Sequence, residues 1–133
     1  MKAIIFVAAL LVCVSIAHAA PYDGSAPMTC TIQAVMVCNE PSACTRGTAQ
    51  TINFPPAVTV DVANRLISGA ATGRTARITS VGRGGGRLML HGQELETLGN
   101  AWDVVVEEAS GAMSGAVLSF GGGFLMFGAC AAP

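Results

Sequence analysis

Charged residues are scarce in this chain: they make up 11% of its 133 residues, and seven basic residues stand against eight acidic ones. A protein that binds nucleic acid or an anionic membrane through its overall charge needs a clear basic surplus. The composition therefore gives no reason to expect nucleic acid or an anionic membrane as a partner.

Residues that commonly carry catalysis are also few. Only His91 of the two histidines lies beyond residue 19, and the chain has no G-x-S-x-G motif. A nucleophilic hydrolase needs a nucleophile, a base and an orienting acid. Glu94 and Glu96 are spaced i, i+2 beside a loop; paired carboxylates can do acid/base work, but a solvated face explains this pair more simply. We predict that the protein is not an enzyme and uses no cofactor.

The most apolar segment is the N-terminus. Residues 1–19 carry one charge at Lys2, an unbroken apolar run over residues 3–14, and Ala17-His18-Ala19 in the A-x-A cleavage pattern. The run is shorter than the roughly 20 residues that span a bilayer. The pattern predicts a signal peptide over residues 1–19, a periplasmic or secreted location, and no transmembrane segment after processing.

The remaining 114 residues suit one domain. The segment 20–27 is short and polar and contains proline and glycine, which predicts a flexible N-terminal lead. The ordered β-domain is expected over residues 28–133.

Four cysteines follow the predicted signal peptide: Cys30, Cys38, Cys44 and Cys130. An even number of cysteines in a small exported domain indicates disulfides, here two. The stretch CNEPSAC lacks the ligand set of a zinc site and the C-x-x-C spacing of a redox motif, so no metal is expected. Pro41 and Ser42 favour a turn that brings Cys38 to Cys44. Cys30 then pairs with Cys130, which joins the first strand to the last.

No segment keeps helical periodicity over ten residues, and residues 93–98 make at most one helical turn. Short strands with glycine-containing or polar turns are expected instead, over residues 28–38, 58–62, 65–67, 75–81, 87–92, 101–108, 112–120 and 124–130. This pattern predicts an all-β fold, a small antiparallel barrel or sandwich of seven to eight strands held by two disulfides.

Alternation also predicts which side chains point inward. In residues 28–38, one face carries Cys30, Ile32, Ala34, Met36 and Cys38, and this face is expected to be buried. Residues 124–130 are apolar on both faces, which is typical of a covered central strand.

Two clusters are candidate binding sites. The first consists of four arginines within fourteen residues: Arg74, Arg77, Arg83 and Arg87. These arginines either lie on solvated strand faces or form a basic patch that binds an anionic ligand. The glycine run between the last two is expected to be a hairpin turn, because it lacks the features of a phosphate-binding loop. The richest apolar cluster is predicted to be core or, alternatively, the wall of a small cavity: Phe120, Phe124, Leu125, Met126 and Phe127.

Several motifs together resemble small uncharacterised exported proteins of Gram-negative bacteria: C-x7-C-x5-C, V-x-V-D-V, AWDVVVEEASGAMSGAV and a closing GGGFLMFGAC. That resemblance implies no functional residues. A weaker resemblance is to the periplasmic inhibitors of c-type lysozyme, which are small β-barrels with an inhibitory Ser-Gly motif. Ser110 and Gly111 would correspond to that motif, but Met113 stands near the expected aromatic residue and the lysine-bearing second motif has no counterpart.

These observations predict an exported, non-catalytic protein that binds a protein or small-molecule ligand, or is associated with the cell envelope. One alternative is an inhibitor of a hydrolase such as lysozyme, which would insert Ser110-Gly111 or the Gly84–Gly86 turn into the enzyme. The other is a carrier of a small apolar ligand, with Phe124 and Met126 in the pocket wall.

Overall fold

The computed structural model describes residues 20–41, 43–94 and 99–132. The predicted signal peptide and most of the helical turn expected over residues 93–98 lie outside the described residues. None of the helical segments in the described part of the chain has the length and apolar character needed to cross a membrane.

The described residues form nine strands and one short 3-10 helix, in the order β1 (Met28–Glu40), β2 (Ala43–Gly47), η1 (Gln50–Ile52), β3 (Ala57–Asp61), β4 (Leu66–Gly69), β5 (Thr75–Gly84), β6 (Arg87–Glu94), β7 (Asn100–Glu107), β8 (Ala112–Ser119) and β9 (Gly122–Ala131).

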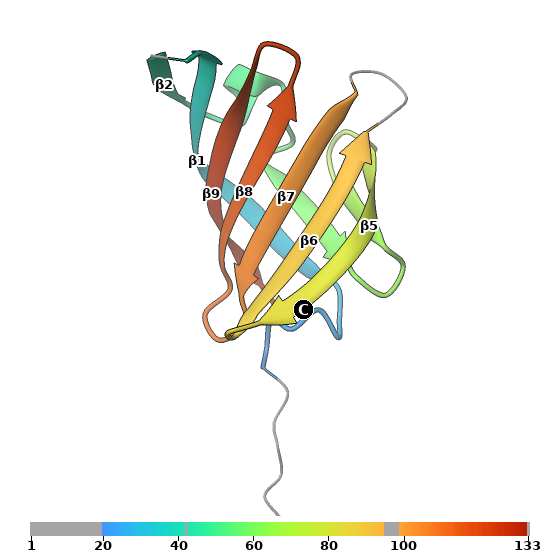
Figure 1. The fold of residues 1–133 in the computed structure, drawn as a ribbon. Helices are drawn as coiled ribbons and strands as arrows, with labels where there is room; N and C mark the ends of the chain where they lie inside the picture. Colours follow the sequence, from blue (N-terminus) through green and yellow to red (C-terminus); the bar gives the residue numbers. More distant parts are fainter. Residues whose placement is uncertain (1–19, 42, 95–98, 133) are drawn as a thin grey trace, which may run out of the picture.

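Eight of these strands close into an antiparallel barrel (Figure 1). From β3 to β9 each strand pairs with the next along the chain, and β9 pairs with β1. The other edge of β1 is shared, because Met28–Thr31 pair with β3 whereas the segment from Val35 to Glu40 pairs with β2. β2 therefore lies outside the ring. The predicted all-β fold is confirmed, as a barrel.

Two disulfides hold the barrel, and both predicted pairings are confirmed. Cys30 and Cys130 are direct partners in the β1–β9 register and are both buried. Cys38 and Cys44 are direct partners in the β1–β2 register. Two disulfides in a small domain indicate folding in an oxidising compartment.

The inward face predicted for β1 is wrong beyond Ile32. The register with β9 shifts by one residue between Ile32 and Ala34, which is a β-bulge at Gln33. An extra residue reverses which side chains face the core, so Val35 is buried in place of Ala34. Cys38 is consequently not part of the inward face.

The prediction that residues 124–130 form a covered strand is also wrong. β9 is central in the sheet, and its inward face carries Met126 and Cys130, both buried. Its outer face carries Leu125 and Phe127, each 45% exposed, and Phe120 at the β8–β9 turn is fully exposed. The apolar cluster predicted from the sequence is thus divided between the two sides of the barrel wall.

Residues 20–27 lie against one end of the barrel, called the base below. The backbone N–H of Tyr22 donates to the carbonyl of Glu108 at 3.2 Å, and Tyr22 packs against the core. Gly24 is buried so tightly that a Cβ there would lie 2.8 Å from Cγ2 of Val62. The N-terminal segment therefore covers the base.

The turn between β3 and β4 contains the interaction that shifts the pKa of Asp61. Asn64 donates its side-chain N–H to Oδ2 at 2.8 Å and its backbone N–H to Oδ1 at 2.9 Å. These hydrogen bonds favour the ionised carboxylate and hold the pKa of Asp61 below its ordinary value of 3.8, the side-chain bond having the larger effect.

Replacing Asn64 by alanine is expected to raise the pKa of Asp61 back toward 3.8, because the larger of the two stabilising hydrogen bonds is removed. Since the folded pKa is depressed, this stabilisation is fully present above pH 3.8 and is lost as the pH falls through the folded pKa. An NMR titration of the Asp61 carboxyl measures the change. An unaltered pKa in the variant would contradict this assignment.

Candidate functional site: a cavity inside the barrel

Inward-facing side chains leave a cavity of about 190 Å³ inside the barrel. Its walls are mostly apolar and come from strands all around the ring. The lining residues from the strands are Ile32, Val58, Val60, Ile67, Gly69, Thr75, Ala76, Glu94, Asn100, Trp102, Val104, Met113, Val117, Phe124 and Met126. The cavity wall therefore includes Phe124 and Met126, as expected under the alternative that the protein carries a small apolar ligand.

The cavity lies toward the end of the barrel opposite the base. Its polar lining residues come from the loop after η1, the β4–β5 turn, the start of β5, the end of β6 and the start of β7: Asn53, Arg74, Thr75, Glu94 and Asn100. These segments all lie at the end drawn uppermost in Figure 1. We call this end the mouth. At the base, by contrast, Met28, Leu88 and Val106 are almost completely buried.

Trp102 is the only tryptophan of the chain and forms part of the cavity wall. Its side chain occupies the space above Gly92 in the neighbouring strand, where an added Cβ would lie 2.0 Å from Cζ2 of the indole. Trp102 is only 8% exposed. Among the described residues its indole Nε1 has no hydrogen-bond partner, although a buried indole N–H usually has one.

A second buried polar atom without a partner lies close by in the chain. Asn100 donates Nδ2–H to Oε2 of Glu94 at 3.4 Å, while its Oδ1 is buried and accepts no hydrogen bond within the described part of the chain. Asn100 and Trp102 are two residues apart on β7 and both line the cavity. The cavity thus combines apolar walls with a few polar lining residues near one end.

Other residues at the mouth contact one another. Arg74 donates from Nη1 to the backbone carbonyl of Asn53 at 2.6 Å. The rings of Phe54 and Phe124 meet edge to face, with centroids 6.4 Å apart. These contacts fix the loop after η1 against the barrel rim.

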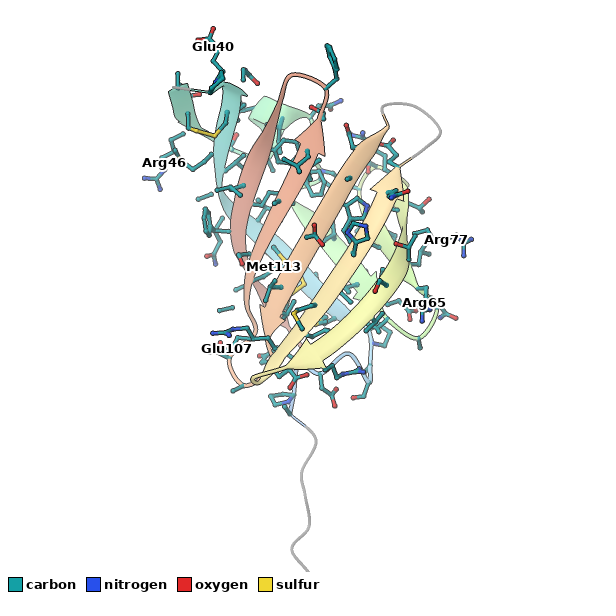
Figure 2. All side chains as sticks on the ribbon, in the orientation of Figure 1. Glu40, Arg46, Arg65, Arg77, Glu107 and Met113 are labelled. Carbon is teal, nitrogen blue, oxygen red and sulfur yellow. A yellow bond between two sulfur atoms is a disulfide. The ribbon has the colours of Figure 1, made fainter. Side chains whose placement is uncertain are left out.

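The four arginines singled out in the sequence do not form one compact patch. Arg74 alone lines the cavity. Arg77 is exposed on the outer wall, directed away from the barrel (Figure 2). Arg83 lies six positions further along β5, roughly 20 Å of strand. At the base, Arg83 donates to the carbonyl of Asp23 at 2.7 Å and lies 3.8 Å from Glu108.

Arg87 is also at the base, where it faces Glu107 across the β6–β7 pair. The preceding Gly85 and Gly86 have φ values of 60° and 72° and form a two-residue β5–β6 turn. The hairpin turn predicted in the glycine run is confirmed and is shorter than the run itself. Arginines at positions 83 and 87 therefore belong to the closed end of the barrel.

Ser110 and Gly111 form the β7–β8 turn, which is at the base, away from the mouth. The hydroxyl of Ser110 donates to the carboxylate of Glu107 and accepts from the backbone N–H of Ala112. Gly111 is buried with a φ of 76°, and a Cβ there would lie 2.9 Å from the ring of Tyr22. The turn is held in place by its own contacts and by the N-terminal segment.

His91 and Asp103 face each other on the outer wall, with Nδ1 of the imidazole 3.0 Å from Oδ1 of the carboxylate. Both side chains are exposed, so the pair lies on the outer surface and not in the cavity. Within the described residues, no group of three or more histidine, cysteine or acidic side chains could hold a metal ion.

Sequence reasoning missed the polar part of the site. The sequence does indicate the position of Trp102, because the alternation of Trp102, Val104 and Val106 places these three side chains on the inward face of the strand. Nothing local, however, shows that Asn100 at the start of β7 meets Glu94 at the end of β6.

The fold and the site define an eight-stranded antiparallel barrel with a mostly apolar cavity open at one end. Comparison of the chain with protein-family models, with curated proteins and with solved structures finds no match. The function must therefore be argued from the cavity itself.

Proposed function

We propose that this protein is an exported, non-catalytic binding protein that holds one small apolar molecule inside its barrel. The observation that carries the proposal is the cavity of about 190 Å³ with its mostly apolar wall. Closed barrels of about eight strands have an interior just large enough to be filled by side chains or to hold one small ligand.

The size of the cavity limits the ligand. Pockets for drug-sized molecules are roughly 300–1,000 Å³, whereas an apolar cavity of about 150 Å³ holds benzene. A cavity of 190 Å³ therefore suits a single small aromatic ring or a short hydrocarbon chain. Fatty acids and other long-chain lipids are too large to be enclosed.

An unfilled cavity of this size is costly. At about 24 cal/mol per Å³, it would destabilise the barrel by on the order of 4 kcal/mol compared with a filled core. Natural cores are close-packed. A small domain that keeps so large a void next to an open end is more simply explained by a bound ligand than by poor packing.

Export is part of the proposal. Residues 1–19 have the pattern of a signal peptide, and the two disulfides suit the periplasm or the exterior of the cell. We therefore place ligand binding outside the cytoplasm.

Toluene is expected to bind the purified protein with a dissociation constant on the order of 0.1–1 mM, which is within the reach of a ligand with so few atoms. Because Trp102 is the only tryptophan and lines the cavity, its single indole N–H signal in an NMR spectrum should shift as toluene is added.

Two neighbouring residues of β7 supply matched variants. Val104 lines the cavity, whereas Val105, the next residue, points to the outer surface. Val104→Phe should fill the cavity and abolish the toluene-induced shift. Val105→Phe should leave toluene binding unchanged. If both variants bind toluene like the parent protein, the ligand is not in the barrel and the proposal fails.

A further inference from the structure

Resting on the proposed function, we infer that the ligand of the cavity is a small apolar molecule that carries a carboxylate, and that Arg74 binds this carboxylate at the mouth. Among the described residues, Arg74 is the one basic side chain that lines the cavity. The apolar part of such a ligand fills the barrel, and its charged end stays at the open end in contact with water.

The guanidinium group of Arg74 lies at the mouth together with its aliphatic stem. Nη1 of Arg74 donates to the backbone carbonyl of Asn53 at 2.6 Å. Asn53 lines the cavity itself, as does the next residue, Phe54. Arg74 is also an exposed residue. Its positive charge is therefore held at the rim, where both the solvent and a molecule in the cavity can reach it.

This positive charge is not neutralised within the part of the chain that the structure describes, because Arg74 takes part in no ion pair there. A guanidinium has five N–H donors in a planar fork, and the bond to Asn53 uses one of them. The edge formed by Nε and Nη2 donates to no other described residue. Two parallel N–H groups on one edge match the two oxygens of a carboxylate.

A carboxylate at the rim suits both parts of the site. Hydrogen bonds between a guanidinium and a carboxylate are charge-assisted and stronger than neutral ones. At an open end the carboxylate keeps much of its water, so the cost of removing a charge from water remains small. The cavity of about 190 Å³ behind it holds one aromatic ring or a short hydrocarbon chain. The ligand class is therefore a small aromatic or short-chain monocarboxylic acid.

Glu94 also lines the cavity, and its charge opposes the binding of an anion. It is held toward β7, because Nδ2 of Asn100 donates to its Oε2 at 3.4 Å. Arg74 is held toward the loop after η1 instead, and the two side chains do not form an ion pair with each other. A bound carboxylate contacts the guanidinium directly, whereas its repulsion from Glu94 acts across an opening filled with water and is weak.

Three probes with the same p-tolyl group and different head groups test the inference: 4-methylbenzoate, 4-methylbenzamide and 4-methylbenzylammonium, at pH 7 and low salt. The unmodified protein should bind 4-methylbenzoate about fivefold more tightly than the neutral amide, near the upper end of what an exposed ion pair gives. The ammonium should bind more weakly than 4-methylbenzoate. The indole N–H signal of Trp102 follows each titration, because Trp102 lines the cavity. Added salt should weaken the binding of 4-methylbenzoate and leave that of the amide unchanged.

Arg74→Met removes the charge and keeps an aliphatic stem. In this variant the preference for 4-methylbenzoate over the amide should disappear, while the affinity for toluene, which carries no charge, changes by less than about twofold. Arg74→Lys keeps the charge without the planar fork and should retain part of the preference. Arg77→Met is the matched control, because Arg77 is exposed on the outer wall of the same strand region. It should leave all affinities unchanged.

The outcomes separate the two proposals. If toluene binds but 4-methylbenzoate binds no more tightly than the amide, or the ammonium binds most tightly, the carboxylate inference is overturned while ligand binding in the barrel stands. An equal loss of affinity for toluene and 4-methylbenzoate in Arg74→Met also overturns it, because Arg74 would then only hold the loop after η1. If Arg74→Met does not fold, the three probes and the salt dependence in the unmodified protein decide. If neither toluene nor any of the three probes binds, the proposed function itself fails.

Discussion

Replacing Cys30 and Cys130 together by alanine is expected to lower the free energy of unfolding by about 4.7 kcal/mol. This disulfide joins residues 100 positions apart, and the chain-entropy model gives about 4.7 kcal/mol for a loop of that length. Small domains are stable by only about 5–15 kcal/mol. The variant should therefore be close to unfolding at room temperature.

The Cys38–Cys44 disulfide is a matched control within the same protein. It closes a separation of only six residues, for which the same model gives roughly 2 kcal/mol. It also lies on the β1–β2 hairpin outside the barrel ring, whereas Cys30–Cys130 joins the two strands that close the barrel. Replacing Cys38 and Cys44 by alanine should cost less than half as much.

Denaturation in urea, followed by circular dichroism for both double variants and the parent protein, measures the two costs. If the two pairs of replacements destabilise equally, loop length does not determine the effect. If the Cys30–Cys130 variant is as stable as the parent, the β1–β9 strand pairing alone is sufficient to close the barrel.

The strand content of this fold could be predicted because it depends on local pattern. Alternation along residues 101–108 and the glycines at positions 85 and 86 are signals read over a few residues, and they correspond to β7 and the β5–β6 turn. The disulfide pairing could also be deduced: four cysteines allow three pairings, and the turn expected at Pro41-Ser42 favours the one that joins Cys38 to Cys44. β2 was not predicted, because a five-residue strand without clear alternation gives too weak a signal.

The bulge at Gln33 shows where local pattern fails. Residues 28–38 alternate without interruption in the sequence, so nothing there marks the position at which the register with β9 shifts. The bulge lies where the partner strand approaches closely: a Cβ on Gly128, which is paired with Ile32, would lie 2.1 Å from the carbonyl oxygen of Thr31. Such a close backbone approach depends on residues about a hundred positions apart.

The two faces of β9 show a second limit. A strand that is apolar on both faces is typically covered on both sides. All strands in the described part of the chain belong to one sheet, and none of them forms a layer over the outer face of the barrel. Leu125 and Phe127 are exposed for this reason. The sequence indicates how apolar each face is and does not indicate whether another layer covers it.

Replacing Gly92 by alanine is expected to lower the free energy of unfolding by about 3 kcal/mol, at the upper end of the usual cost of overpacking. The new Cβ would lie 2.0 Å from Cζ2 and 2.4 Å from Cε2 of Trp102, and 2.5 Å from the backbone oxygen of Arg77. The indole would have to leave its position in the cavity wall, and the backbone carbonyl of β5 cannot move away without disturbing the β5–β6 pairing.

Gly82→Ala is the matched control, because Gly82 is also a strand glycine at the β5–β6 interface. A Cβ there meets only the flexible end of Met89, at 3.4 Å, so this variant should be as stable as the parent or up to about 1 kcal/mol more stable. Urea denaturation measures both variants, and fluorescence of the single tryptophan reports whether Trp102 has moved. We expect emission to shift to longer wavelength in Gly92→Ala alone, because its displaced indole meets water. Unchanged emission together with full stability in Gly92→Ala would show that Trp102 does not pack over Gly92, and the cavity wall described here would then be wrong.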